Sequence, residues 1–279
     1  MTLAAVTEVS PDGFAALERL EDALGRYERL IVAFSGGVDS AVLLAAAHRV
    51  LGPNAVALTA DSPSMARAEL DHAIRFATTL GVEHRIVRTG EMAKPEYVRN
   101  ERDRCFWCKQ TLFDVASELA EAAGGTTVAY GYTRDDVGDY RPGHEAAKKA
   151  GVVAPLWDAG LGKREIRAIA RALGLDVWDK PAAPCLSSRI PYGSEVTVEK
   201  LRAIEGMEAL LHELGFRVCR ARYDGREMRI ELEPKEIPRA VESGIQRTLL
   251  AKARALGVAT LTLDLEGFVS GKLNRSAAP

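Results

Sequence analysis

The chain has 279 residues, of which 47% are apolar and 27% charged, the balance of an ordinary globular protein. Its formal net charge is −2, from 37 basic and 39 acidic residues, which argues against a highly basic protein that coats nucleic acid. The longest apolar stretch, residues 38–47, is interrupted by Asp39 and Ser40, so no membrane span is expected. The first residues lack the pattern of a secretion signal, which predicts a cytoplasmic location.

Apolar periodicity predicts alternating helices and strands through the first part of the chain. Residues 13–29 carry apolar side chains at helical spacing, and 30–34 is a short apolar run typical of a buried strand. Further helices are predicted at 41–51, 65–80, 105–123 and 163–173, and further strands at 55–59, 84–87, 127–130 and 152–155. This alternation predicts an α/β fold with a doubly wound parallel sheet and helices on both of its faces.

The pattern changes at residues 179–193, which are rich in Pro, Ser and Gly. We place a domain boundary there, with a first domain at 1–184 and a smaller α+β domain at 185–279. In the second domain, helices are predicted at 198–214 and 235–256, and strands at 216–223, 227–232 and 259–265.

A glycine-rich loop, SGGVDS, joins the first predicted strand to the following helix. In doubly wound sheets this position, at the carboxyl end of a strand, is where ligands bind. Gly36 and Gly37 let the backbone approach an anion, while Ser35, Ser40 and the helix start supply donors to phosphate oxygens. Asp39 suits a Mg²⁺ ligand or an organiser of the loop. The loop is neither GxGxxG nor the Walker form. The alternative without a ligand is a glycine-rich turn with a serine N-cap.

SGGVDS resembles the PP-loop of the N-type ATP pyrophosphatase superfamily, which includes GMP synthetase, NAD synthetase, argininosuccinate synthetase and tRNA thiolases. These enzymes cleave ATP between the α and β phosphates and transfer AMP to a carboxylate or carbonyl oxygen. The resemblance implies an adenylation, with the loop holding the leaving pyrophosphate, and says nothing of the acceptor.

Three of the four cysteines are candidates for redox, metal or sulfur chemistry. Cys105 and Cys108, in RCFWCK, begin a predicted helix, where the first N–H groups favour a thiolate. Cys185 lies in PAAPCLSSRIPYG, close to the domain boundary. Three thiolates suit a [4Fe–4S] cluster with one iron free of protein ligands, and equally a zinc site, a sulfur relay or unpaired buried thiols. Cys219 falls within a predicted strand and is expected to be a core thiol.

The loop GYTRDDVGDYRPG follows the strand predicted at 127–130. It gathers Asp135, Asp136 and Asp139, together with Arg141, at the carboxyl end of that strand. Carboxylates there suit Mg²⁺ held against phosphates, and the alternative is a solvated acidic turn.

Together the motifs RCFWCK, DDVGDYRPG and DKPAAPCLSSRIPYG make residues 30–274 resemble the LarE family, ATP-dependent sulfur transferases of nickel-pincer cofactor synthesis. The resemblance implies that ATP adenylates a carboxylate of pyridinium-3,5-biscarboxylic acid mononucleotide. Sulfur then bonds to the carboxylate carbon and AMP leaves, giving a thiocarboxylate, and a second pass gives the bisthiocarboxylate precursor of the lactate racemase cofactor.

The family has two kinds of sulfur donor, and the cysteines of this chain resemble one of them. In one kind the cysteine matching Cys185 gives up its own sulfur and becomes dehydroalanine. In the other, a CxxC joins that cysteine to hold a [4Fe–4S] cluster whose free iron carries a hydrosulfide. Because Cys105 and Cys108 are present besides Cys185, the resemblance implies the cluster kind.

Residue by residue, the resemblance implies catalytic roles for Cys185 and Asp39 and cluster ligation by Cys105, Cys108 and Cys185. It also implies ATP and Mg²⁺ as cofactors and a homo-oligomer, a hexamer, with no nucleic acid or membrane as partner. The residues implied at ATP or pyrophosphate are Ser35, Gly36, Gly37, Asp39, Ser40 and Asp136. Those implied at the substrate are Ser188, Arg189, Glu208, Arg220, Arg222 and Arg229. Arginine suits a phosphate or carboxylate by bidentate contact, although each of these arginines also suits a solvated strand face.

Three other functions compete with this interpretation. A tRNA thiolase of the same superfamily needs a basic surface, whereas residues 186–279 have nearly balanced charges and no visible RNA-binding module. A non-catalytic nucleotide-binding regulator would keep SGGVDS without needing three cysteines. A glutamine-dependent amide synthetase would need an amidotransferase domain or external ammonia.

Overall fold

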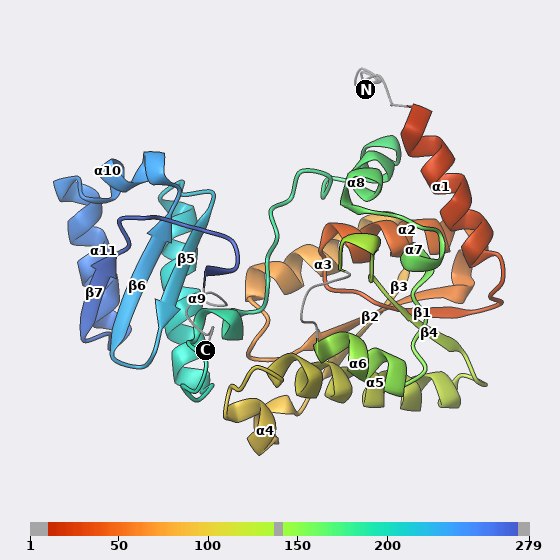
Figure 1. Ribbon diagram of the computed structural model, residues 1–279, viewed down its shortest axis with the longest axis horizontal. Helices are drawn as coiled ribbons and strands as arrows, with labels where there is room; N and C mark the ends of the chain where they lie inside the picture. Colours follow the sequence, from red (N-terminus) through yellow and green to blue (C-terminus); the bar gives the residue numbers. More distant parts are fainter. Residues whose placement is uncertain (1–10, 137–141, 273–279) are drawn as a thin grey trace. The chain divides into compact units, whose positions relative to one another are not determined.

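The computed structural model describes residues 11–136 and 142–272, which fold into two compact units (Figure 1). The chain enters the second unit three times. The first unit comprises Met1–Ser62, Arg67–Gly90 and Cys105–Ala183, and the second comprises Pro63–Ala66, Glu91–Arg104 and Pro184–Pro279. Two short segments of the first half of the chain therefore belong with its C-terminal part.

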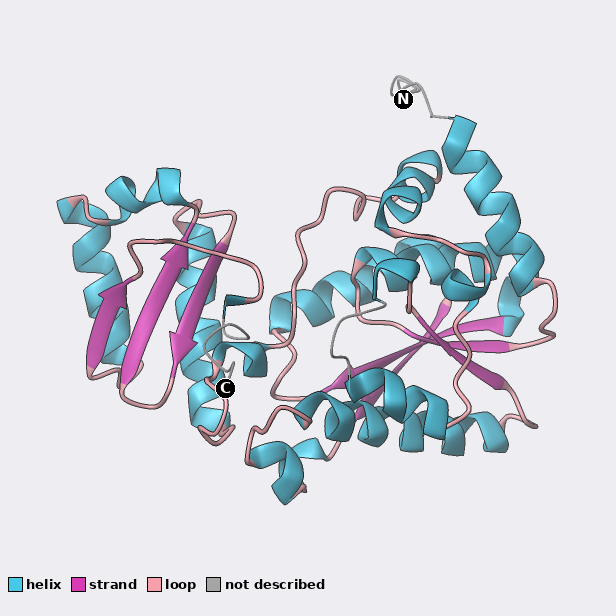
Figure 2. Cartoon of the chain, viewed as in Figure 1, coloured by secondary structure: helices cyan, strands magenta, loops and turns pink. Residues whose placement is uncertain are grey.

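The first unit is built on a parallel sheet, drawn in magenta in Figure 2. Its strand order is β3-β2-β1-β4, with β1 in the centre paired in register with both neighbours, Leu30 opposite Ala55 and Thr127. The strands are β1 (Leu30–Ala33), β2 (Ala55–Asp61), β3 (Glu83–Arg88) and β4 (Thr127–Tyr130). All four residues of β1 are buried, as expected of a central strand covered on both faces.

Helices cover both faces of this sheet, which confirms the predicted fold class. The unit's helices are α1 (Pro11–Leu24), α2 (Val38–Leu51), α3 (Arg67–Leu80), α5 (Arg104–Ala122), α6 (Pro142–Lys149), α7 (Pro155–Asp158) and α8 (Lys163–Ala172), with 3₁₀ turns η1 (Gly52–Asn54) and η3 (Arg134–Asp136). Figure 1 shows α1, α2 and α8 on one side and α5 and α6 on the other. Phe113 of α5 packs with Ile31 of β1 and Ala146 of α6 in one buried cluster.

The predicted strand at 152–155 is wrong. Within the described residues, this segment contributes one isolated parallel bridge, between Val153 and Ala129, and then becomes α7 at Pro155. Proline has no N–H to continue a ladder but suits the first position of a helix, so the strand stops where the helix starts.

The second unit contains a mixed sheet with strand order β5-β6-β7, in which β5 and β6 are antiparallel and β6 and β7 parallel. The strands are β5 (Cys219–Tyr223), β6 (Glu227–Leu232) and β7 (Thr260–Leu263). The helices are α4 (Pro95–Val98), α9 (Val198–Glu213), α10 (Ile237–Ala240) and α11 (Ser243–Ala255), with 3₁₀ turns η2 (Glu91–Ala93), η4 (Leu186–Arg189) and η5 (Pro234–Glu236).

The single helix predicted at 235–256 is also wrong, because this segment forms η5, α10 and α11 in turn. Glu242, at the start of α11, has an extended backbone with φ −58° and ψ 136° that interrupts the helix. Pro238 lies in the first turn of α10, where a missing N–H costs nothing. No helix within the described ranges is long and apolar enough to cross a membrane.

Candidate functional site

The PP-loop lies between β1 and α2, at the carboxyl edge of the parallel sheet. Gly36 has φ +73°, a conformation that a side chain would strain. The Ser35 backbone N–H donates to Ser40 Oγ at 3.2 Å, and Ser40 Oγ donates to the Gly37 carbonyl at 3.1 Å. These contacts fold the loop around the start of α2, whose first N–H groups can receive an anion.

Asp39 stands in the first turn of α2 and is ion-paired with a lysine distant in sequence. Lys163 Nζ, at the start of α8, lies 2.5 Å from Asp39 Oδ2. The other oxygen, Oδ1, is buried and accepts no hydrogen bond from the residues that the structure describes. A buried carboxylate oxygen without a partner is costly, which suits a bound cation at this position.

A second lysine contacts the loop on its other flank. Lys180 Nζ donates to the Gly36 carbonyl at 3.1 Å and to Glu69 Oε2 at 2.7 Å. Its side chain is 17% exposed, so the ammonium is held largely within the fold. Sequence reasoning missed Lys163 and Lys180. Lys180 stands in the sequence DKP, in the segment that follows α8 (Lys163–Ala172), whereas Lys163 looks like any lysine in a first helical turn.

The end of β4 closely approaches the PP-loop. A Cβ placed on Gly131 would lie 3.1 Å from the Ser40 backbone nitrogen and 3.2 Å from Asp39 Cβ, so only glycine fits without a shift. Asp136, in η3 just beyond, is 3% exposed, and its Oδ2 accepts from the Thr133 N–H at 2.9 Å. This end of the sheet therefore carries two acidic residues, Asp39 and Asp136.

The other residues predicted in this acidic loop are Asp135, Asp139 and Arg141. Asp135 Oδ2 accepts the Lys163 backbone N–H at 2.5 Å, so this carboxylate satisfies an N–H at the start of α8. Asp139 and Arg141 lie outside the described residues.

The candidate cluster cysteines belong to different units. Cys105, exposed, and Cys108, half-buried, stand three residues apart near the start of α5, where such a spacing puts them on one helix face. Cys185, half-buried, precedes η4 in the second unit. Among the residues described, no group of three or more His, Cys, Asp or Glu is assembled to hold a metal ion. Cys219 is fully buried as predicted, and burial, followed by nearby Glu208, raises the pKa of its thiol to about 12.

Arg189 holds the backbone around Cys185. Its guanidinium pairs with Glu208 of α9 in two contacts, Nε to Oε1 at 2.9 Å and Nη2 to Oε2 at 2.8 Å. Nη1 donates to the carbonyls of Pro184 at 2.5 Å and Cys185 at 3.2 Å. Glu208 Oε1 also accepts the Ala221 N–H of β5 at 3.0 Å. The pair therefore ties the cysteine segment to a helix and a strand of the same unit.

The remaining predicted substrate residues divide into two groups. Arg222 joins the network, because Nη1 donates to the Ser188 carbonyl at 2.8 Å and Nη2 lies 2.9 Å from the fully buried carboxylate of Glu231. Arg229 is 41% exposed and lies 3.4 Å from an oxygen of Asp264.

Arg220 stacks on an aromatic ring, with its guanidinium carbon 5.0 Å from the centre of Phe268. Burial, followed by the charge of Arg189, lowers its pKa. The structure thus brings Ser188, Arg189, Glu208 and Arg222 into one hydrogen-bonded network, while Arg220 and Arg229 contact other partners.

We expect Glu208→Ala to lower the free energy of unfolding by about 3–5 kcal/mol, because it leaves the Arg189 guanidinium buried without its counter-ion. Chemical denaturation of the full chain measures this. The matched control is Lys235→Ala, which breaks an ion pair on a 71% exposed lysine and should cost less than about 1 kcal/mol. Equal losses for both variants would contradict a structural role for the Arg189–Glu208 pair.

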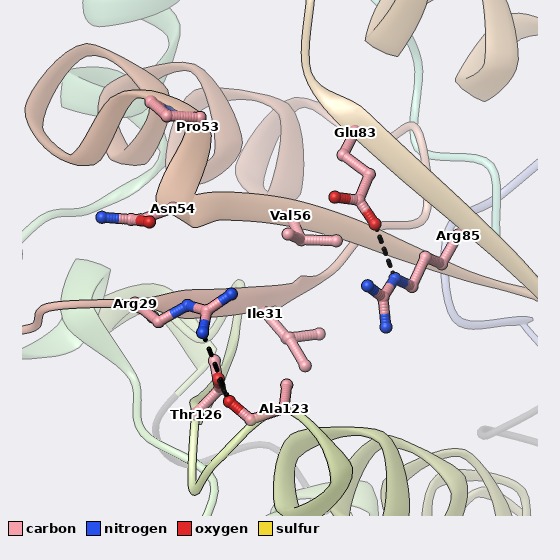
Figure 3. A pocket seen from close by; sticks show the side chains of 9 residues that line it. All are labelled: Arg29, Ile31, Pro53, Asn54, Val56, Glu83, Arg85, Ala123 and Thr126. Atoms are coloured by element: carbon pink, nitrogen blue, oxygen red, sulfur yellow. Dashed lines mark hydrogen bonds and ion pairs between the residues drawn. The ribbon is translucent and has the colours of Figure 1, made fainter.

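A small cavity lies at the opposite, amino edge of the first unit's sheet (Figure 3). Arg29 Nη1 donates to the Ala123 carbonyl at 3.4 Å, and Arg85 Nε lies 2.7 Å from Glu83 Oε1. Both arginines among its lining residues are thus engaged within the chain, and none of the lining residues belongs to the loop SGGVDS.

The strand order and the glycine-rich loop after β1 are those of a PP-loop α/β domain. A family model described as "Queuosine biosynthesis protein QueC" matches residues 29–98, which include the loop. The chain is 46% identical over 259 residues to an uncharacterized protein of Synechocystis, covering 93% of this chain and 97% of that protein.

Two further relatives are named by their activities. The chain is 34% identical over 255 residues to the pyridinium-3,5-bisthiocarboxylic acid mononucleotide synthase of Lactiplantibacillus plantarum, with 90% of this chain and 91% of that protein covered. It is 26% identical over 213 residues to a glutamine-hydrolyzing GMP synthase component of Methanopyrus kandleri, covering 71% and 67% of the two chains. The chain therefore belongs to the LarE family, that of the Lactiplantibacillus synthase, and is an enzyme.

Proposed function

We propose that this enzyme is an ATP-dependent sulfurtransferase that converts the carboxylates of pyridinium-3,5-biscarboxylic acid mononucleotide to thiocarboxylates. The observation that carries the proposal is the identity with the Lactiplantibacillus synthase across nearly the whole of both chains. The geometry around the PP-loop supports the first half of this proposed reaction.

The first half-reaction is an adenylation. The α2 N-terminus, Ser35 and Ser40 would receive the phosphates of ATP, with Lys163 and Lys180 as flanking cations. These lysines take the place of the single lysine that a Walker loop carries within its own sequence. Mg²⁺ would be held by Asp39, whose buried Oδ1 has no partner among the described residues, with Asp136 as the second acid.

The proposed reaction consists of two displacements. A substrate carboxylate oxygen attacks the α phosphorus, the bond to the β-phosphate oxygen breaks, and pyrophosphate leaves. A sulfur nucleophile then attacks the carboxyl carbon, the bond to the adenylate oxygen breaks, and AMP leaves. Activation is required because a carboxylate oxygen is a poor leaving group, whereas AMP is a good one.

For the sulfur donor we propose a [4Fe–4S] cluster held by Cys105, Cys108 and Cys185. Cys185 would also be a catalytic residue. Thiolates are the ordinary ligands of such a cluster, and a cluster with three protein ligands would supply sulfide from its remaining iron. Support comes from a contact next to two of these cysteines. Arg104, which precedes Cys105, donates from Nη1 at 2.8 Å to the carbonyl of Ser187, two residues after Cys185.

The Arg189–Glu208 pair would act by positioning Cys185, since its contacts fix the carbonyls of Pro184 and Cys185. Ser188, Arg220, Arg222 and Arg229 are proposed to bind the phosphate and second carboxylate of the substrate. Residues 185–279 would then be a domain of substrate binding, sulfur transfer and oligomerisation. We further propose that the enzyme is a cytoplasmic homo-oligomer, a hexamer, that takes sulfide from an external source and acts in nickel-pincer cofactor synthesis.

The adenylation is tested with the purified full chain and ATP. We expect AMP and pyrophosphate as products, and only when the pyridinium dicarboxylate mononucleotide is present, because its carboxylate is the nucleophile. Chromatography of the nucleotides measures this. Formation of ADP by the pure enzyme would contradict the assigned chemistry.

A further inference from the structure

Four ring side chains form a cluster at the carboxyl end of β4 in the first unit. They are Tyr130, Tyr132, His144 of α6 and Trp157 of α7. The rings of Tyr132 and His144 are parallel to within 8°, with centres 4.0 Å apart, and Trp157 lies 5.5 Å from Tyr132. The Tyr130 hydroxyl is hydrogen-bonded to His144 Nδ1, and this bond holds the imidazole ring in its stacked orientation. We call these four residues the β4 ring cluster.

The β4 ring cluster lies beside the adenylation machinery. Gly131, between its two tyrosines, is the residue whose Cβ would lie 3.1 Å from the Ser40 backbone nitrogen. Gly143, directly before His144, would place a Cβ 3.5 Å from the Cys105 carbonyl. The cluster therefore lies between the PP-loop and the first cysteine of the CxxC, within one unit.

Trp157 presents an open ring at this position. It is 40% exposed, and its ring contacts Tyr132 but no lysine or arginine of the described chain. The comparable tryptophan of the same unit, Trp178, is 37% exposed and carries the Arg171 guanidinium 4.0 Å above its ring. Aromatic faces attract cations, and no lysine or arginine of the described residues covers the face of Trp157.

We propose that the β4 ring cluster is the platform on which the positively charged pyridinium ring of the substrate stacks, with Trp157 as its contact surface. This inference rests on the proposed function. A pyridinium ring is flat and permanently cationic, so it combines ring stacking with cation–π attraction. Stacked there, its carboxylates would lie next to the loop that activates them. Tyr132, stacked on His144, holds Trp157 in place and is a positioning residue.

Steady-state kinetics of the full chain test the platform. Trp157→Ala should raise KM for the pyridinium substrate roughly 5- to 30-fold and leave KM for ATP within about 2-fold. Trp157→Phe should recover most of the loss, because it retains an aromatic face. The matched control is Trp178→Ala, for which both KM values should be unchanged. A rise in KM for ATP alone would show that the ring received is adenine, and equal effects of the two tryptophan variants would also overturn the proposal.

A binding measurement separates this inference from the reaction itself. The two probes are N-methylpyridinium-3,5-dicarboxylate and pyridine-3,5-dicarboxylate, which differ in the charge of the ring. The affinity of each for the full chain is to be measured. The charged probe should bind the wild-type protein more tightly, and Trp157→Ala should abolish that preference. If the variant still prefers the charged probe, the pyridinium ring binds elsewhere. The proposed function would then stand as long as ATP is converted to AMP in the presence of the substrate. If no AMP forms with the substrate at all, the proposed function fails instead.

Discussion

Replacing Asp39 with alanine is expected to reduce the conversion of ATP to AMP and pyrophosphate by at least about a hundred-fold. The substitution removes the carboxylate whose unpartnered Oδ1 suits Mg²⁺ and whose Oδ2 anchors Lys163 beside the loop. Both effects weaken the stabilisation of the charge that develops on the leaving pyrophosphate. Release of pyrophosphate in the presence of the substrate measures the loss.

The fold should survive this change, because the ion pair that Asp39 makes is with a lysine whose side chain is 41% exposed. Thermal unfolding of the variant checks this. Asp71→Ala, which removes an exposed acid from α3 of the same unit, should leave pyrophosphate release unchanged. Undiminished release by the Asp39 variant would refute the role assigned to that residue.

Replacing Cys185 with alanine is expected to abolish thiocarboxylate formation and, because Cys185 is a ligand of the proposed cluster, to remove bound iron. Cys105→Ala and Cys108→Ala should lose iron as well, because a cluster left with two protein ligands is labile. Cys219→Ala is the matched control. Its thiol is fully buried with a raised pKa, so this variant should keep its iron. Iron and sulfide analysis after anaerobic purification measures all four.

The sacrificial alternative predicts a different outcome for the same cysteine. With a cluster as donor, the wild-type enzyme should turn over repeatedly when sulfide is supplied, and Cys185 should keep its mass. If Cys185 were itself the donor, it would become dehydroalanine after one round, and the variants at Cys105 and Cys108 would remain active. Mass spectrometry of the protein after turnover separates the two, and stoichiometric dehydroalanine would contradict the cluster.

The fold of the first unit was predictable because β1, β2 and β4 are short, largely apolar runs separated by segments with helical periodicity and by glycines. The error at 152–155 arose because an apolar run ending in proline fits a buried strand and a helix start equally well. The division of 235–256 depends on the extended backbone at Glu242, a residue that is unremarkable within a helical pattern. Likewise, no local pattern marks Glu91–Arg104 as part of the second unit, since that grouping depends on contacts distant in sequence.

The part of the candidate site that lies in a sequence motif was predictable. The residues that reach the site from distant parts of the chain were not. SGGVDS identified the loop, but Lys163 and Lys180 reach it from far along the chain, and lysines on helices and in turns are usually solvated. Arg189 and Glu208 were both expected at the substrate, whereas the structure pairs them with each other. Their direct contact with the substrate therefore remains a prediction, beside the positioning role that the geometry supports.

In the proposed reaction, sulfur replaces a carboxylate oxygen of the substrate while ATP is cleaved to AMP and pyrophosphate. The most direct measurement is the mass of the nucleotide product after anaerobic incubation of the full chain with ATP, Mg²⁺, sulfide and pyridinium-3,5-biscarboxylic acid mononucleotide. We expect a product in which one oxygen is exchanged for one sulfur, with one AMP released for each sulfur incorporated. AMP formed with an unchanged substrate mass, or sulfur incorporated without AMP, would overturn the proposed function.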